Sequence, residues 1–261
     1  HWGVTETWAS PLDRGGARYE RGYTEGRNAG SIQFYTAEGV VLEGGYSGGV
    51  VVGERQAASG KLAQAGRMKF GGAGDDDRQW LLANLIISNS PVQLPADFGA
   101  TTPLSSFWYS GLSGVISPPN DDSFLRRTTY LDSDVLAAAG FGTIELYVSK
   151  SFTLEKGTTL ELTPGSSLIV QANSTDAYSQ NFRIDGVIRA AGGTVRLNQA
   201  ENVYFCAGAA IDVSGQWVNQ RTDAATASAP VIGGGSIEVM NARFEPGAVL
   251  DVSGGGWYRL Q

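Results

Sequence analysis

The stretch Gly193-Thr194-Val195-Arg196-Leu197 decides the fold, because the chain repeats its pattern of a glycine, a small hydroxyl residue and an alternating apolar run. The other copies are Gly30-Ser31-Ile32-Gln33-Phe34, Gly142-Thr143-Ile144-Glu145-Leu146 and Gly235-Ser236-Ile237-Glu238-Val239. A longer phrase recurs at 208–215 and 247–254, and both copies end in Asp-Val-Ser-Gly. Chains that repeat one short unit stack equivalent units on one another. We therefore expect a repeat protein.

The repeats predict strands that stack in parallel. From Phe141 onward the chain consists of apolar-alternating runs of three to five residues that end in Gly, Asn, Asp or Pro-Gly, without hairpin Asn-Gly turns. Such runs are typical of the rungs of a parallel β-helix. The spacing between Gly142, Gly193 and Gly235 indicates about two turns per interval. Roughly ten to twelve rungs would give a rod about 50–60 Å long.

Composition excludes some functions and supports an all-β fold. Glycine contributes 36 of 261 residues, and charged residues are 17%, below the usual share of about 25%. The net charge is −7 and the longest basic run is Arg126-Arg127, so binding to nucleic acid is not expected. A single cysteine, Cys206, excludes an intrachain disulfide, and its apolar surroundings predict a small buried side chain.

Residues 1–261 are expected to form one β-helix segment of a longer chain. Short strands are predicted at 31–35, 40–43 and 50–52. Residues 71–131 are rich in proline and tryptophan, which predicts an excursion from the regular rungs that has a strand at 82–88. Residues 132–140 predict the one short helix, capped by Ser133 and ended by Gly140. No apolar run approaches the roughly 18 residues of a transmembrane helix, and no export leader is found.

Several stretches resemble the filamentous-haemagglutinin-like large exoproteins of Gram-negative bacteria. These stretches are 129–146, 186–197, 84–98 and the two phrases that lead from Asp212 and Asp251 to a tryptophan. The resemblance covers roughly 30–54 and 82–257. It implies a right-handed parallel β-helix that a dedicated outer-membrane transporter exports by two-partner secretion. It also implies a secreted or cell-surface location and a role in adhesion, in biofilm or filament formation, or as a stalk for toxin delivery.

Two glycine-rich motifs suggest chemistry that the rest of the chain does not support. Gly45-Tyr46-Ser47-Gly48-Gly49 matches the pattern of a nucleophile elbow, but the only histidine is His1, so a turn is expected there. Residues 71–77 resemble the start of a calcium-binding nonapeptide and end in Asp75, Asp76 and Asp77. These three aspartates are the only metal candidates, and a solvated acidic loop is the alternative. No cofactor is expected.

A carbohydrate-active β-helix enzyme is the main alternative to a structural role, because paired carboxylates can cleave glycosidic bonds. The Gly-His-Gly motif of pectin hydrolases is absent, and Asp121-Asp122 lies in the predicted excursion. Asp212 and Asp251 occupy equivalent repeat positions, which predicts equivalent hydrogen bonds in turns. We therefore expect no enzymatic activity.

Two further motifs concern the surface. Phe107, Trp108 and Tyr109 form an aromatic group that either binds sugars or a partner, or anchors the excursion. Asn173-Ser174-Thr175 matches a glycosylation sequon, which has little weight in a bacterial chain. The expected function is a stiff rod that displays loops for adhesion, and its receptor or glycan is not specified by the sequence.

Overall fold

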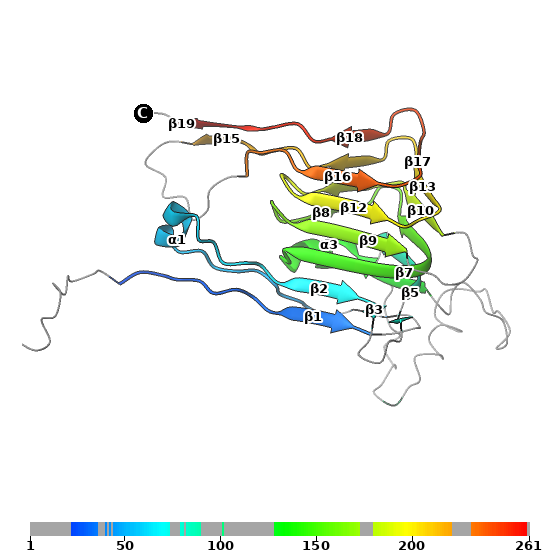
Figure 1. Cartoon of the computed structure of the whole chain (residues 1–261), viewed down its shortest axis with the longest axis horizontal. Helices are drawn as coiled ribbons and strands as arrows, with labels where there is room; N and C mark the ends of the chain where they lie inside the picture. The colour runs from blue at the N-terminus through cyan, green and yellow to red at the C-terminus, as the bar shows by residue number, and fades with distance from the viewer. Residues whose placement is uncertain are drawn as a thin grey trace, which may run out of the picture.

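The computed structural model describes residues 22–35, 40, 42, 44–73, 79–80, 82–89, 101, 128–172, 180–220 and 231–259. This part of the chain is mostly β-strand. It contains two helices, α1 (Glu54–Ser59) and α3 (Ser133–Ala138). Nearly all strands pair in parallel, and they lie one above another in a stack that runs from β1 to β19 (Figure 1).

The first column of the stack contains all four copies of the repeated pentapeptide. Its strands, in order of pairing, are β1 (Ser31–Phe34), β2 (Arg67–Phe70), the first half of β7 (Thr143–Leu154), β9 (Ser167–Ala172), β12 (Thr194–Asn198) and β16 (Ser236–Val239). Thr194 lies between Ser167 and Ser236 in register. The prediction that the repeats line up along one column is therefore confirmed.

The second column begins with two strands in reversed order. Its strands are β6 (Thr128–Asp132), β5 (Leu82–Ser88), the second half of β7, β10 (Asn181–Ile184), β13 (Asn202–Phe205) and β17 (Ala242–Phe244). β6 follows β5 in the chain but pairs on the side of β5 away from β7. The polypeptide therefore returns by one level before it continues along the stack. The strand predicted at 82–88 is confirmed, and it belongs to the stack.

The third column is shorter because a helix takes the place of its first strand. Its strands are β8 (Thr159–Glu161), β11 (Val187–Arg189), β14 (Ala210–Asp212) and β18 (Val249–Asp251). α3 contacts β8, the end strand of this column. We call the strands that lie at one level of the three columns a rung. β12, β13 and β14 form the penultimate rung, and β16, β17 and β18 form the last rung.

Two small sheets lie outside the three columns. β15 (Trp217–Gln220) and β19 (Gly256–Arg259) pair in parallel and extend away from the last two rungs, on the side where α1 also lies (Figure 1). β3 (Gly72–Ala73) and β4 (Gln79–Trp80) form a two-residue antiparallel ladder.

Apolar side chains from the three columns meet in one continuous core. The inward positions alternate with outward polar positions, so that Phe182 and Ile184 are buried and Asn181 and Arg183 are exposed. Phe152 and Phe182 contact each other edge to face, with ring centroids 5.8 Å apart. Alternation of this kind is what a strand with one buried face requires.

The structure corrects several expectations about the size of the stack. Its first column contains six strands, so the estimate of ten to twelve rungs is wrong for the described residues. The interval from Gly142 to Gly193 spans two levels, as predicted, but the interval from Gly193 to Gly235 spans only one. The extra length of that second interval includes β15, which leaves the column and adds no level.

The first 60 residues and the helices also differ in detail from expectation. The strand at 31–34 is confirmed, but residues 40, 42 and 50–52 are not in strands. α1 was not predicted. Its first turn has no hydroxyl cap, and the Gly53 N–H instead donates to Gln56 Oε1 at 3.0 Å. α3 lies where a helix was predicted, but its N-cap is Asp132, whose carboxylate accepts hydrogen bonds from two backbone N–H groups.

Candidate interaction surface at the last rung

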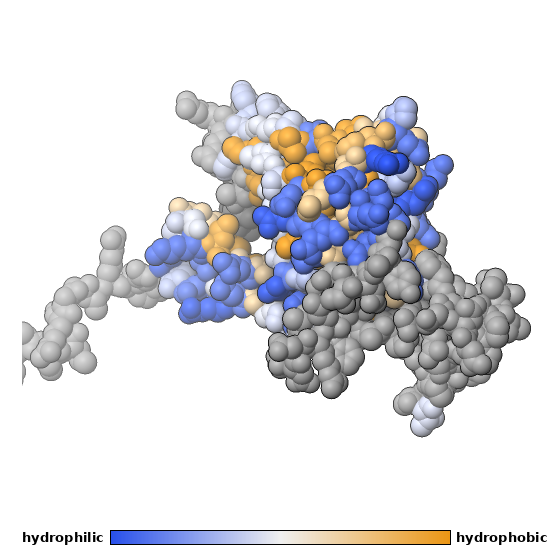
Figure 2. All heavy atoms as spheres, turned by 45° about the vertical axis from the view of Figure 1, so that its right-hand side comes forward, coloured by the Kyte–Doolittle hydropathy of each residue, from blue (hydrophilic) through white to orange (hydrophobic). Residues whose placement is uncertain are grey.

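The last rung exposes side chains at positions that the penultimate rung buries. Phe205 and Ile211 are 0% exposed, whereas Phe244 and Leu250, their partners in the last rung, are 51% and 40% exposed. Phe244 stacks on Phe205 with ring centroids 4.5 Å apart, so one face of its ring is covered and the other is open. Hydrophobic residues gather at this upper end of the molecule in Figure 2. We call the surface formed by these positions the end face.

Strand edges accompany the apolar side chains of the end face. β16, β17 and β18 each lie at the end of their column and, within the described residues, pair only with the strand of the penultimate rung. The opposite edge of each strand presents backbone N–H and C=O groups that can pair with another strand. The end face therefore combines a hydrophobic surface with hydrogen-bonding edges.

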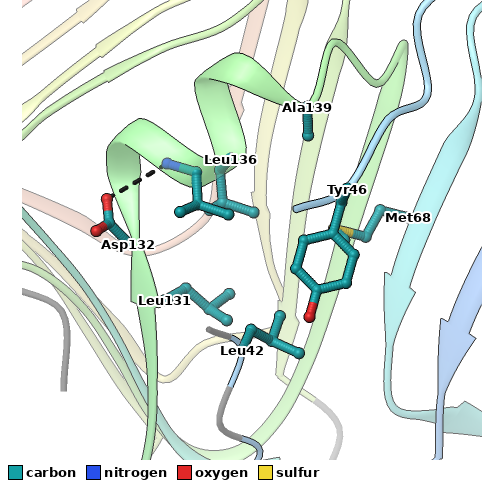
Figure 3. Close-up of a pocket in the computed structure, with 8 residues that line it drawn as sticks. Leu42, Tyr46, Met68, Leu131, Asp132, Leu136 and Ala139 are labelled. Carbon is teal, nitrogen blue, oxygen red and sulfur yellow. Dashed lines mark hydrogen bonds between the residues drawn. The ribbon is translucent and has the colours of Figure 1, made fainter. Parts of the chain in front are cut away.

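The opposite end of the stack is built differently. Leu42 and Tyr46, from the segment after β1, face Leu131, Leu136 and Met68 across a small gap (Figure 3). The gap measures about 10 Å³, which is room for roughly one water molecule. Leu42, Tyr46 and α3 thus pack against the core at this end, and the gap is too small to bind an organic ligand.

Outward side chains form ladders along the first column. Arg196 Nε lies 3.2 Å from Glu238 Oε2, and Thr194 Oγ1 lies 3.1 Å from Ser236 Oγ. Each of these contacts joins a residue to its in-register partner on the next strand. Opposite charges and matched hydroxyls at such positions favour the observed register.

A further charged contact in this column is diagonal, because Arg67 lies in register with Thr143 and not with Glu145. Glu145 in β7 is 5% exposed, and its Oε2 accepts hydrogen bonds from Arg67 Nη2 at 2.6 Å and from the Tyr147 hydroxyl at 3.3 Å. The hydrogen bond to Glu145 raises the pKa of Arg67. Since Arg67 belongs to β2, this group ties the early strands to the rest of the stack.

We expect Arg67→Met to lower the free energy of unfolding by about 1–3 kcal/mol. The substitution keeps the aliphatic stem but leaves the buried carboxylate of Glu145 without its cationic partner. The expected loss is smaller than for a fully buried pair, because the Arg67 side chain is 53% exposed. Urea denaturation measures the loss.

The double variant Arg67→Met with Glu145→Gln tests the cause of this loss, because it also removes the unpaired charge of Glu145. It should recover most of the stability. Arg189→Met serves as the control, since the Arg189–Glu161 pair is exposed and its atoms are 3.7 Å apart. If the double variant is no more stable than Arg67→Met, the buried charge is not the cause.

The raised pKa values of three tyrosines predict that the free energy of unfolding falls at alkaline pH. Burial raises the pKa values of Tyr46, Tyr130 and Tyr147, and the neighbouring Glu145 adds to the effect on Tyr147. Above about pH 10 the unfolded chain loses phenolic protons that the folded chain retains. The unfolded state then binds fewer protons, so the free energy of unfolding falls as the pH rises.

Tyr147→Phe should make that fall with pH less steep between about pH 10 and 12, because one of the retained protons is removed. Thermal unfolding followed by circular dichroism across this pH range is the measurement. A slope equal to that of the unchanged chain would show that Tyr147 does not contribute.

Most of the residues that the sequence singled out for function lie outside the described residues. This holds for the calcium candidates Asp75, Asp76 and Asp77 and for the aromatic group of Phe107, Trp108 and Tyr109. It also holds for His1, Asp121-Asp122 and the sequon at 173–175. The roles proposed for these residues therefore stay predictions.

The described candidates have structural roles. Asp212 Oδ1 accepts from the Ser214 N–H at 3.0 Å, and Asp251 Oδ1 accepts from the Ser253 N–H at 2.9 Å. The hydrogen bonds from Ser253 lower the pKa of Asp251. Both aspartates thus hold equivalent turns, as predicted. Cys206 is buried, as expected, and burial raises the pKa of its thiol.

The Gly45–Gly49 motif does not form a strand-to-helix elbow. Ser47 is exposed in a segment without regular structure. Gly48 lies so close to the ring of Phe141 that a Cβ atom would come within 2.2 Å of it. The Gly48 N–H donates to the Ala139 carbonyl at 2.7 Å, which fastens the segment to the end of α3. The glycine therefore serves packing.

Sequence reasoning missed the end face, although Leu250 lies in one of the repeats. Among the described residues no group of three or more His, Cys, Asp or Glu side chains is arranged to hold a metal ion. No helix in the described ranges has the length and apolar character needed to cross a membrane. No family model, curated protein or solved structure matches the chain.

Proposed function

We propose that the chain is a segment of a right-handed parallel β-helix and serves as a stiff structural rod of a secreted or surface-displayed bacterial exoprotein. The rod would act in adhesion or in biofilm or filament formation. The observation that carries the proposal is the in-register parallel pairing of six strands in one column. Two further columns rise beside it, so backbone hydrogen bonds run along the length of the stack.

In such a stack the stability of the fold depends on the inward residues and little on the residues at the surface. Inward positions form the core, whereas outward side chains such as Arg183 and Tyr204 and the connections between strands contribute little to it. A scaffold of this kind tolerates varied loops at its corners and can present them at fixed spacing. These are the properties that an adhesive rod needs.

Export by an outer-membrane transporter of the two-partner type is part of the proposal and rests on the sequence resemblance. Co-expression of the chain, joined to a family export domain, with its transporter should place the chain at the cell surface. Accessibility to an added protease in intact cells is the measurement. A chain that stays inside the cells, while the export domain alone is secreted, would contradict the proposed route.

The adhesive role is tested by displaying the chain on a bacterium that does not adhere. We expect several-fold more surface-attached cells than with a display-matched variant, Phe182→Asp, that disrupts the core. Parallel incubation of the purified chain with neutral and acidic polysaccharides tests the alternative of a carbohydrate-active enzyme. Turnover that a single Asp or Glu substitution abolishes, together with background adhesion, would overturn the proposal.

A further inference from the structure

We propose that the end face is the docking surface for a further parallel rung, supplied in cis by polypeptide that continues from β19. The inference deepens the rod proposal and rests on the stacked fold, not on adhesion. Two adjacent rungs differ in the exposure of equivalent side chains. Val195, Leu197 and Val213 are 0% exposed because a rung covers them, whereas Val252, the counterpart of Val213 in the last rung, is 53% exposed.

The end face continues an interface that the molecule already uses at every level. The penultimate and last rungs meet through three parallel ladders, β12 with β16, β13 with β17 and β14 with β18. The upper edges of β16, β17 and β18 have the same backbone groups as the rung below and, toward the core, apolar side chains at the same positions. A further rung of the same kind would pair with these backbone groups and would cover these apolar side chains.

The path of the chain favours a rung in cis. β15 and β19 pair in register from Trp217 opposite Gly256 to Gln220 opposite Arg259. The described chain resumes at Val231, whose carbonyl accepts a hydrogen bond from the Gln216 N–H, and begins β16 one level above β12. Arg259 is one level above Gln220, so a strand that follows β19 as β16 follows β15 would lie above β16.

A second copy of the chain fits the end face less well. Head-to-tail stacking would require an open end at the start of the stack, where Leu42 and Tyr46 pack against the core. Tyr46 also contacts Phe34 of β1 edge to face, with ring centroids 6.3 Å apart. Two end faces that meet about a two-fold axis would pair antiparallel and lose the in-register columns.

The outward ladders specify the sequence of the docking rung. A hydroxyl residue should lie over Ser236, which already contacts Thr194 Oγ1 at 3.1 Å. A lysine or arginine should lie over Glu238, because the pair below it joins Arg196 to Glu238 and like charges in register destabilise a sheet. The first strand of the docking rung therefore has the pattern Gly, Ser or Thr, apolar, Lys or Arg, apolar.

A designed extension tests the proposal on the full chain. The 261 residues are followed by a duplicate of residues 221–259 in which the copy of Glu238 is lysine. The matched control has serine at the copies of Ile237, Val239, Phe244 and Leu250. We expect the extension, but not its control, to slow hydrogen exchange of the edge amides in 236–251 at least about ten-fold, because docking pairs these amides. Equal exchange in both chains would overturn the proposal.

A second measurement does not depend on folding of the extension. The unextended chain should be monomeric and should bind a hydrophobic fluorescent dye at the end face. Phe244→Ser with Leu250→Ser should reduce dye binding several-fold, while Met240→Ser, at an exposed outward position, should leave it nearly unchanged. Absence of dye binding, or concentration-dependent protection of 236–251 in a dimer, would overturn the proposal. Neither result depends on whether displayed cells adhere.

Discussion

Gly193→Ala is expected to lower the free energy of unfolding by at least about 2 kcal/mol, whereas Gly30→Ala should change it by less than about 0.5 kcal/mol. Both glycines open a copy of the same pentapeptide. A Cβ atom at Gly193 would lie 2.2 Å from the carbonyl oxygen of Ser166, the residue that precedes β9 on the level below. A Cβ atom at Gly30 meets nothing within 4 Å, because β1 is the first strand of its column.

The two variants separate steric packing from backbone freedom, because neither glycine has a positive φ. The same comparison extends along the column, since a Cβ at Gly235 would lie 2.0 Å from the carbonyl oxygen of Gly193. Urea denaturation of the three alanine variants measures the effect. Equal losses at Gly30 and Gly193 would show that the glycines are not required by the approach of neighbouring strands.

Phe182→Ala should have the largest effect of the alanine substitutions considered, a loss of about 3–5 kcal/mol. The Phe182 side chain is fully buried at the middle of the second column, and its ring packs against Phe152. Removing it leaves a cavity that the strands above and below restrict from closing. A loss of this size is a large fraction of the stability of a typical domain.

Phe244→Ala is the matched control for the buried phenylalanine. It makes the same chemical change in the same column, but half of the Phe244 surface is already exposed. We expect a loss of about 1–2 kcal/mol, because less apolar surface leaves water when this ring packs. Chemical denaturation at equal protein concentration compares the two variants. A larger loss for Phe244→Ala would mean that the end face is buried in solution.

Local patterns in the sequence predicted the features that depend on neighbours along the chain. The glycine, hydroxyl and apolar pattern placed four strands in one column, and equivalent turns followed from Asp212 and Asp251. A helix was expected where α3 lies. Each of these features is specified within about ten residues, so periodicity and turn chemistry suffice to find it.

Features that depend on contacts between distant segments could not be predicted in this way. β2 starts with Arg67 in place of a hydroxyl residue, and its partner Glu145 is 78 residues away. The return of the chain from β5 to β6 leaves no local pattern. The expected rung count is too high because one level holds short strands on three sides, which a linear sequence does not distinguish from separate levels. Likewise, only the order of rungs decides that Phe205 is buried and Phe244 exposed.

The in-register parallel stack is tested most directly by a disulfide between two adjacent strands. In a Cys206→Ala background, Thr194→Cys with Ser236→Cys joins in-register positions whose Cα atoms are about 4.8 Å apart, within the range of a disulfide. Oxidation should link the two cysteines within one chain, as mass spectrometry of peptides detects. Thr194→Cys with Glu238→Cys, two residues out of register, should not link. Efficient linkage of the second pair, or of neither, would contradict the stack.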